Sequence, residues 1–202
     1  MTLPAGPPRI HPAAIVEEGV LIGEGTAVWD GVHIRRGARI GRSCIIGEKT
    51  YIAYDVVVGD LVKINSHVYI CTGVVIERGV MVAAGTIFTN DRFPRATDPD
   101  LTALRPSGPT EETENTLVKE GATLGSGAVI GPGVTIGRWA MAGMGAVVTK
   151  DVPDFALVLG NPAQRAGWVC RCGKRLPSGP EPVCPACGRA YRLLEGETLA
   201  EA

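Results

Sequence analysis

This sequence has few aromatic side chains, almost no net charge and no long apolar run. Aromatic residues make up 5% of the 202 positions, and the formal net charge is −1. Without a broad basic field, nucleic acid and anionic membrane surfaces are poor partners. No apolar run approaches the roughly 20 residues that span a bilayer, and residues 1–8 contain no apolar signal region. These absences predict a cytoplasmic protein with neither nucleic acid nor membrane among its partners.

A period of six residues organises the chain from Ile10 to Phe88. Every sixth position in this stretch is aliphatic, or aromatic at the last step, and the position four residues later is small or β-branched. The first series reads Ile10, Val16, Ile22, Val28, Ile34, Ile40, Ile46, Ile52, Val58, Ile64, Ile70, Ile76, Val82 and Phe88. Neither an amphipathic helix nor an isolated strand has this period, whereas a solenoid of short strands and tight turns does. The 27 glycines supply backbone angles that such turns need.

The same phase resumes after residue 117. The second series reads Val118, Leu124, Ile130, Ile136, Ala142 and Val148. This hexapeptide repeat resembles that of the hexapeptide acyltransferases, which implies an all-β fold, the left-handed parallel β-helix. Three hexads would make one triangular coil, so positions that are three hexads apart would lie directly above one another. The narrow interior of such a prism agrees with a core of small aliphatic side chains.

Stacking at intervals of three hexads gathers polar and aromatic side chains on one wall. The hexads that form this wall begin at Val28, Ile46, Ile64 and Val82. Its outward positions include Trp29, Asn65, His67, His33, Tyr51 and Tyr69. This concentration indicates a site, although the aromatic rings would also suit packing against a neighbouring subunit. Both interpretations hold if the protein is a homotrimer, because trimeric members of this fold build their active sites between adjacent subunits.

Residues 89–117 interrupt the repeat. A loop of this length in a compact domain is usually functional or disordered. Its first half carries Asn90, Asp91, Arg92 and Arg95, which could reach an anionic ligand. Its second half, Pro106 to Asn115, is expected to be mobile. The alternative is a surface insertion that is merely tolerated.

Five segments narrow the resemblance to one family. They read Val28-Trp29-Asp30-Gly31-Val32-His33-Ile34, Val62-Lys63-Ile64-Asn65, Phe88-Thr89-Asn90-Asp91-Arg92-Phe93-Pro94-Arg95, Thr116-Leu117-Val118-Lys119 and Gly145-Ala146-Val147-Val148-Thr149-Lys150-Asp151-Val152-Pro153. Over residues 10–165 the chain resembles the acetyltransferases that N-acetylate the 3-amino group of UDP-2-acetamido-3-amino-2,3-dideoxy-glucuronate. The resemblance implies acetyl-CoA-dependent N-acetylation of a nucleotide-linked amino sugar, with a UDP-3-amino-uronic acid as the expected acceptor, in surface polysaccharide (lipopolysaccharide) biosynthesis.

The acceptor amine is expected near the stretch from Lys63 to Val68. The family typically has Lys-Ile-Gln-Asn-Asn-Val there, with an amide side chain near the amine, whereas this chain has Lys-Ile-Asn-Ser-His-Val. The resemblance therefore implies that Asn65 or His67 takes that catalytic place, where His67 could accept a proton. The alternatives are proton transfer to the departing thiolate and a structural hydrogen bond from His67 at a coil corner.

Further acceptor contacts are expected from four other side chains. Trp29 would stack on uracil or pack at a subunit interface. His33 would orient the nucleotide or bond across the subunit boundary. Arg92 and Arg95 would pair with a uronate carboxylate or the pyrophosphate.

The donor side resembles the acyl-CoA end of the same enzymes, in which the pantetheine arm lies between subunits and is held by backbone amides. The segments that carry this likeness are 145–153 and Gly160-Asn161-Pro162-Ala163. The implied cofactor contacts are Ala142, Gly143, Thr149, Lys150, Asn161 and Arg165. Lys150 and Arg165 suit phosphates electrostatically, although both would also be ordinary as solvated surface charges.

Four of the six cysteines form two close pairs near the C-terminus, each pair followed by glycine. They are Cys170, Cys172, Cys184 and Cys187. In a reducing compartment such knuckles predict a four-cysteine zinc ribbon rather than two disulfides. No further ligand or nearby base indicates catalysis, so we expect a structural zinc. The other two, Cys44 at an inward position and Cys71, are expected to be inert.

The expected organisation is a lead-in (1–9), a β-helix domain (10–165), a zinc ribbon (166–192) and a tail (193–202). Three other functions compete with the one above. Another small acceptor would make the protein a different O- or N-acetyltransferase. A γ-type carbonic anhydrase would need three histidines around zinc, two of them five residues apart, which His11, His33 and His67 do not provide. A non-catalytic scaffold would not need the segments that resemble an acyl-CoA site.

Overall fold

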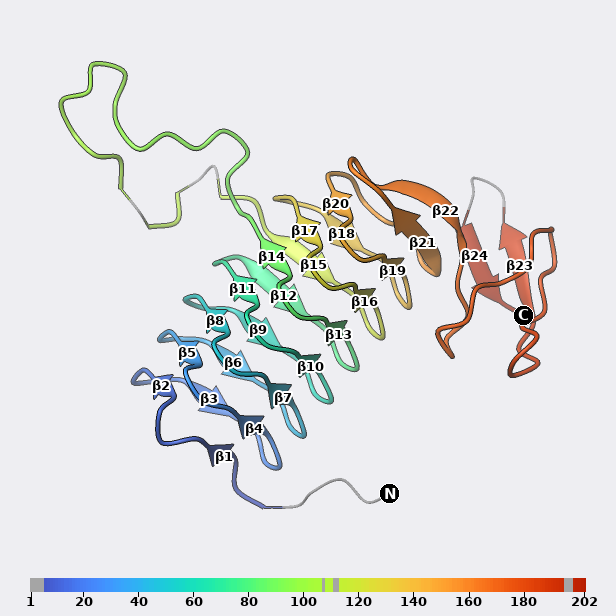
Figure 1. Ribbon diagram of the computed structural model, residues 1–202, viewed down its shortest axis with the longest axis horizontal. Coiled ribbons are helices and arrows are strands. Elements are labelled where there is room, and N and C mark those ends of the chain that lie inside the picture. The colour runs from blue at the N-terminus through green and yellow to red at the C-terminus, as the bar shows by residue number, and fades with distance from the viewer. Residues whose placement is uncertain (1–5, 107, 111–112, 195–197) are drawn as a thin grey trace.

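The computed structural model describes residues 6–106, 108–110, 113–194 and 198–202. All regular structure in these residues is β-strand: three stacked sheets form the sides of a prism, and a small hairpin unit follows (Figure 1). Within the described residues no helix is long and apolar enough to cross a membrane. Residues 1–5 of the expected lead-in lie outside the described part of the chain, as do residues 107, 111 and 112 of the segment expected to be mobile.

The strands occupy the three sheets in rotation along the chain. Sheet I contains β1 (Arg9–Ile10), β4 (Ala27–Val28), β7 (Ile45–Ile46), β10 (Lys63–Ile64), β13 (Met81–Val82), β16 (Thr123–Leu124), β19 (Met141–Ala142), β21 (Ala156–Leu159) and β22 (Gln164–Trp168). Sheet II contains β2 (Ile15–Val16), β5 (His33–Ile34), β8 (Tyr51–Ile52), β11 (Tyr69–Ile70), β14 (Ile87–Phe88), β17 (Val129–Ile130) and β20 (Val147–Val148). Sheet III contains β3 (Leu21–Ile22), β6 (Arg39–Ile40), β9 (Val57–Val58), β12 (Val74–Ile76), β15 (Thr116–Val118) and β18 (Thr135–Ile136).

Successive coils stack in the register that the six-residue period predicts. Ile45 pairs in parallel with Ala27 on one side and with Lys63 on the other, and each partner is three hexads away in the sequence. Across the interruption Ile87 pairs with Val129, so the extra residues loop out without disturbing the stack. The predicted all-β solenoid is therefore confirmed.

Inward positions of the repeat form one thin core that runs the length of the prism. Its isoleucines, such as Ile34, Ile52 and Ile70, are fully buried. Buried threonines satisfy their hydroxyl groups within the stack: Thr26 Oγ1 donates to the Gly41 carbonyl at 2.8 Å. Burial raises the pKa of the Cys71 thiol to about 11, which agrees with an inert cysteine.

The turns of the prism form three edges, two of which border sheet II. Edge I–II, between sheets I and II, consists of the turns 11–14, 29–32, 47–50, 65–68, 83–86, 125–128 and 143–146. Edge II–III consists of the turns 17–20, 35–38, 53–56, 71–73, 131–134 and 149–152, together with the insertion, residues 89–115. The predicted wall was wrong in one respect: it is not flat, because Trp29 and its stacked neighbours lie in edge I–II and only the His33 column stands on sheet II.

The C-terminal end of the prism joins a small unit that we call the ribbon, residues 169–202. Strand β22 folds back antiparallel on β21 and leads into it, so β22 crosses the expected domain boundary at residue 165. Residues expected to form a tail belong to β23 (Tyr191–Leu194) and β24 (Thr198–Glu201), which pair with each other. Leu199 is buried in the ribbon core, so the ribbon extends beyond residue 192.

Candidate functional site

Edge I–II brings Trp29, Asn65 and His67 to one border of sheet II. Trp29 is 50% exposed and His67 is exposed, whereas Asn65 is half-buried. Trp29 and Asn65 lie two coils apart, which is about 10 Å along the prism axis. The His67 imidazole has no hydrogen-bond partner among the described residues, so a structural bond at the coil corner finds no support.

The face of sheet II carries a hydrogen-bonded cluster that the sequence reasoning missed in part. Glu17 Oε1 lies 3.1 Å from His33 Nε2 and 2.6 Å from Arg35 Nε. Glu17 Oε2 accepts the Arg36 N–H at 2.9 Å. That backbone bond, followed by His33 and Arg35, holds the pKa of Glu17 below its usual value. His33 therefore uses its Nε2 within its own chain, while its side chain stays 31% exposed.

Aromatic rings continue this face along the prism. The Tyr51 and Tyr69 rings stack at 5.3 Å between centroids, and His33 meets Tyr51 edge-on at 5.6 Å. Arg35 donates to the Tyr51 hydroxyl at 3.0 Å. The missed partners had a signal in the sequence, because Glu17 and Arg35 are three hexads apart and therefore stack directly.

Edge II–III carries the insertion, which is closed at its base by an ion pair. Arg92 makes two hydrogen bonds to Glu114, at 3.1 and 3.0 Å, and one to the Pro132 carbonyl at 3.3 Å. Hydrogen bonding to Arg92 lowers the pKa of Glu114. The expected pairing of Arg92 with a substrate carboxylate therefore meets a competitor inside the chain, and Arg92 serves to hold the insertion in place.

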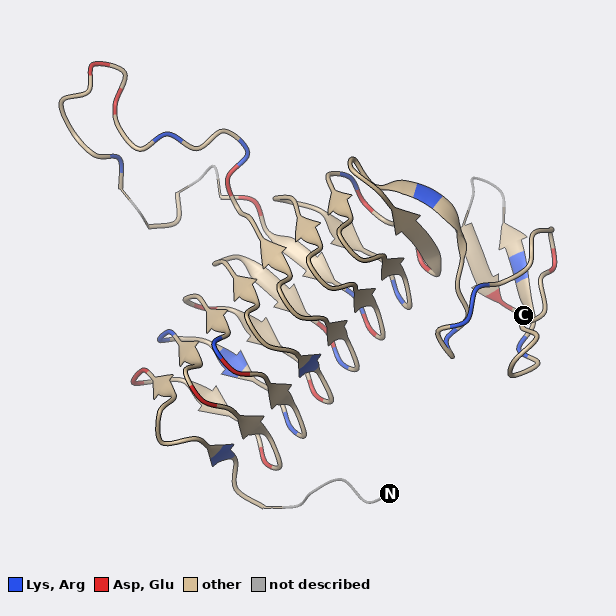
Figure 2. Cartoon of the chain, in the orientation of Figure 1, with Lys and Arg blue, Asp and Glu red and all other residues tan. Residues whose placement is uncertain are grey.

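The other predicted residues of the insertion face a cavity of about 950 Å³ between the insertion and edge II–III. Its lining includes Arg36, Arg95, Arg105, Tyr54, Asp55, Thr72, Asn90 and Asp91. Many charged positions lie in the insertion and in the turns, as Figure 2 shows for the described residues. The predicted acceptor residues are thus divided between the two borders of sheet II rather than gathered in one pocket.

The predicted donor contacts lie at the far end of the prism: Thr149 and Lys150 are in edge II–III, whereas the other four belong to β19, β22 and the turns after β19 and β21. Lys150 and Arg165 line a second cavity of about 350 Å³. Thr149 and Asn161 are exposed beside it in the turns after β20 and β21. Ala142 and Gly143 were expected to offer open amides, but the Ala142 side chain is fully buried and the Gly143 N–H donates to the Val158 carbonyl at 2.9 Å.

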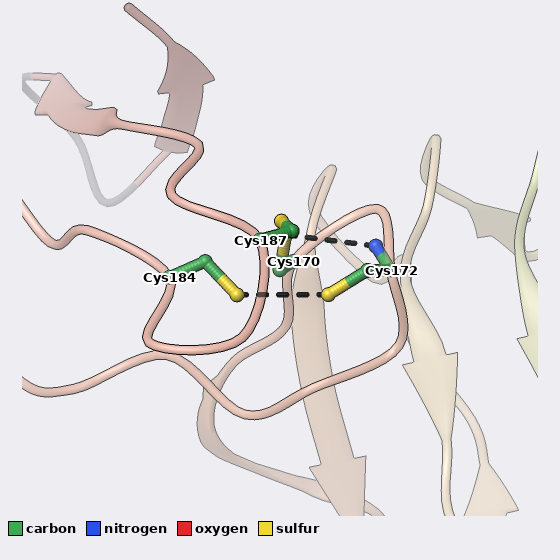
Figure 3. Close-up of side chains that lie close together, drawn as sticks. All are labelled: Cys170, Cys172, Cys184 and Cys187. Carbon is green, nitrogen blue, oxygen red and sulfur yellow. Dashed lines mark hydrogen bonds between the residues drawn. The ribbon is translucent and has the colours of Figure 1, made fainter.

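The four paired cysteines meet in the ribbon (Figure 3). Their sulfur atoms all lie within 4.8 Å of one another, and the Cys170–Cys187 and Cys172–Cys184 pairs stand at 3.4 and 3.5 Å. Tetrahedral zinc with bonds of about 2.3 Å requires sulfurs about 3.8 Å apart, so the set fits this ion.

Hydrogen-bond donors lie beside two of the four sulfur atoms. The Tyr191 hydroxyl donates to Cys170 Sγ at 3.1 Å, and Arg189 Nη1 lies 3.4 Å from Cys187 Sγ. The Arg189 backbone N–H and the Cys170 thiol lower the pKa of Cys187 to about 6. Among the described residues this is the one group of three or more potential ligands, and no histidine belongs to it.

Comparisons with known proteins agree with the repeat and the prism. Residues 19–54 match the sequence model of the family "Bacterial transferase hexapeptide (six repeats)". The chain is 41% identical over 86 residues to the dTDP-3-amino-3,6-dideoxy-alpha-D-galactopyranose 3-N-acetyltransferase of Aneurinibacillus thermoaerophilus, a match that covers 43% of this chain. The matched segment spans less than half of that relative, 45% of its length.

Two solved structures share the fold. The product of the Bacillus cereus gene BC4754 has a TM-score of 0.54 at 20% identity, over 81% of this chain and 78% of that one. A hexapeptide-repeat acetyltransferase of Vibrio cholerae, solved with acetyl coenzyme A, has a TM-score of 0.51 at 21% identity, over 65% of this chain and 70% of that one. The protein is thus a hexapeptide-repeat β-solenoid. Part of its sequence is related to a sugar N-acetyltransferase.

Proposed function

We propose that this protein transfers an acetyl group from acetyl-CoA to the amino group of a nucleoside-diphosphate-linked 3-amino sugar. The observation that carries the proposal is the 41% identity to a 3-N-acetyltransferase of a dTDP-linked 3-amino sugar. The expected UDP-3-amino-uronic acid and that relative's acceptor have in common a hexose with a 3-amino group on a nucleoside diphosphate. The relative's sugar has no carboxylate, so the relative supports a 3-amino hexose as acceptor but not specifically a uronate.

Acetyl-CoA is proposed to bind along the C-terminal half of edge II–III. Lys150 and Arg165, which line the cavity of about 350 Å³, would contact its phosphates. Thr149 and Asn161 would offer polar contacts beside them. Ala142 and Gly143 are left out of this proposal because the stack already uses their side chain and amide.

The chemistry needs alignment more than activation. The neutral amine attacks the thioester carbon, an N–C bond forms and the C–S bond breaks, and coenzyme A leaves as the thiol. Backbone N–H groups of a turn would stabilise the oxyanion. The amine proton passes either to the leaving sulfur or to His67, whose exposed imidazole has no partner among the described residues.

A homotrimer would complete the site. In a single chain, sheet II separates His67 and Asn65 on edge I–II from Arg95 and Lys150 on edge II–III. A rotational assembly sets edge I–II of one copy against edge II–III of the next. Light scattering tests the oligomeric state directly.

The four-cysteine cluster is proposed to hold a structural zinc ion. The sulfur spacing and the surrounding donors support this. Bound zinc would fix the two knuckles and so the path of the chain after β22.

The test is an acceptor screen with acetyl-CoA, in which free thiol release is followed. We expect thiol release with dTDP- or UDP-linked 3-amino sugars and none with the matching 3-hydroxy sugars. Equal rates with the 3-hydroxy sugars would indicate an O-acetyltransferase. Thiol release with none of them, together with no binding of acetyl-CoA, would overturn the proposal.

A further inference from the structure

We propose that the cavity between edge II–III and the insertion binds the nucleoside diphosphate of the acceptor. The inference is based on one cavity of about 950 Å³, whose lining includes Tyr54 and three arginines. We call these three, Arg36, Arg95 and Arg105, the cavity arginines. The inference rests on the proposed function, because it assigns one part of the acceptor to one surface. A binding experiment without turnover tests it separately.

The cavity arginines form no ion pair with a carboxylate among the described residues, unlike Arg35 and Arg92 and like the exposed Arg39; they differ from Arg39 in lining one cavity together. Arg35 pairs with Glu17 at 2.6 Å, and Arg92 pairs with Glu114 at 3.0 Å. No carboxylate among the described residues forms such a pair with a cavity arginine. Three unpaired guanidinium groups around one hollow favour an anionic ligand, and their fork of donors suits phosphate oxygens.

The prism fixes the first of these cations. Glu17 Oε2 accepts the Arg36 N–H at 2.9 Å and so holds the turn that carries it. The Arg36 guanidinium carbon lies 5.5 Å from the centroid of the Tyr54 ring, and Arg35 holds the same ring at 4.2 Å. Arg36 and Tyr54 therefore present a cation and an aromatic surface side by side, as a phosphate and a base would require.

The insertion positions the other two cations together. Arg105 donates its backbone N–H to the Ala96 carbonyl at 3.0 Å, and Thr97 bridges to Leu104. These bonds place Arg95 and Arg105 on facing segments of the insertion. The Arg92–Glu114 pair closes the base below them, so the insertion faces the prism across the cavity.

The size and polarity of the cavity fit a nucleotide. Small-molecule sites typically measure about 300–1,000 Å³. Asp55 and Asp91 also line the cavity, so its five charged groups sum to one net positive charge, from three arginines and two aspartates. Carboxylates are suitable acceptors for ribose hydroxyl groups. A purely anionic ligand such as free phosphate would find a poorer match.

The donor has a separate place. The two cavities share no lining residue. Both follow edge II–III, and three coils, about 14 Å, separate the turn of Thr72 from that of Lys150. A sugar extending from a nucleotide in the first cavity would thus point along the edge towards the donor.

The experiment measures the affinity of the full-length chain for dTDP, UDP and pyrophosphate by isothermal titration calorimetry. The variants are Arg36→Gln, Arg95→Gln, Arg105→Gln and Tyr54→Leu. The matched control is Arg39→Gln, because Arg39 stands on the same coil as Arg36 but is exposed on sheet III, outside the cavity. Thermal unfolding midpoints identify any variant that has lost its fold.

We expect each arginine variant to raise the Kd for dTDP or UDP about tenfold, the usual effect of losing a hydrogen bond to a charged group. Tyr54→Leu should weaken the binding of dTDP and UDP and leave the binding of pyrophosphate unchanged. Arg39→Gln should bind the nucleotides with native affinity, and all variants should bind acetyl-CoA with native affinity. Unchanged nucleotide affinity in all four variants would overturn the inference even if acetyl transfer is found. Nucleotide binding that depends on the cavity arginines without acetylation of any amino sugar would leave the cavity assigned and remove the proposed function.

Discussion

One column of stacked residues on edge I–II has left-handed backbone angles, which favour glycine, yet two of its members carry long side chains. Its members Gly31, Lys49, His67 and Gly85 have positive φ angles of 64°, 57°, 58° and 70°. A side chain in this left-handed region costs about 1–2 kcal/mol. Glycine would be the residue of least strain at position 67, but Lys49 bears the same strain one coil away, so the backbone angle alone does not assign a function to His67.

Replacing His67 with glycine separates this strain from the function of the side chain. The His67→Gly variant should unfold at the same temperature as the native protein or higher, because the left-handed turn is relieved. Its kcat should fall about 100-fold if His67 takes the amine proton, the usual size of a general-base contribution. Steady-state kinetics over pH and thermal unfolding measure both.

Lys49→Gly is the matched control, since Lys49 lies one coil away in the same column with nearly the same φ angle. It should gain stability in the same way and keep its activity. A near-native kcat and pH profile in His67→Gly would instead assign the proton to the departing sulfur.

Glu17 provides a pH-dependent bond between the first two coils. Its pKa lies below the usual value, so its contribution to stability is fully present above the unfolded pKa of 4.5 and is lost as pH falls through the lower, folded value. The unfolding temperature of Glu17→Gln should therefore lie below that of the native protein at neutral pH and approach it in acid. A difference that stays constant down to pH 3 would contradict this role.

At the scale of structural elements, the period predicts much more than any single motif does. Two-residue strands have almost no propensity signal of their own, yet the repeat of three hexads per coil places Ile45 between Ala27 and Lys63 as observed. The same arithmetic would have paired Glu17 with Arg35. The arrangement of the insertion could not be predicted, because neither the Arg92–Glu114 pair nor the Thr97–Leu104 bridge follows any repeat.

Strand β22 joins the donor cavity to the ribbon. Arg165 lines the cavity and its guanidinium lies 4.9 Å from the Trp168 ring. Trp168 packs against both the prism core and the ribbon core, two residues before Cys170. The ribbon should therefore influence how firmly Arg165 is held.

Loss of one sulfur ligand tests this connection. Native protein should contain about one zinc per chain, the content of a four-cysteine structural site. Cys184→Ser should lose the metal, make the ribbon sensitive to proteolysis and raise the KM for acetyl-CoA, while the acceptor KM changes less. Mass spectrometry of the intact protein gives the metal content.

Cys71→Ala serves as the control, because Cys71 is buried in the prism core far from the cluster. It should keep its zinc and its KM values. A folded ribbon without metal in the native protein would show that the cysteines have another purpose.

At the scale of the whole molecule, the proposed chemistry is divided between two borders of one sheet. His67 and Asn65 stand on edge I–II, and the cavity of Arg36 stands on edge II–III. One copy of the chain cannot bring them to the same atom, whereas a ring of copies joins unlike edges at each interface. The separation of these residues is therefore compatible with one active site only if that site lies between two copies of the chain.

Mixing two defective proteins tests the shared site. His67→Gly keeps a native edge II–III, and Arg36→Gln keeps a native edge I–II. When the two are unfolded together and refolded at equal amounts, about one quarter of the interfaces in a closed ring should combine native edges from both sides, because each edge is native in half of the copies. With the acceptor well below its KM, where Arg36→Gln alone keeps about one tenth of the native rate, the mixture should recover about one quarter of the native rate. Mixing the variants after separate refolding is the control and should give no gain. Failure of the co-refolded mixture to exceed its parents would mean that each chain works alone or that one of the two edges takes no part.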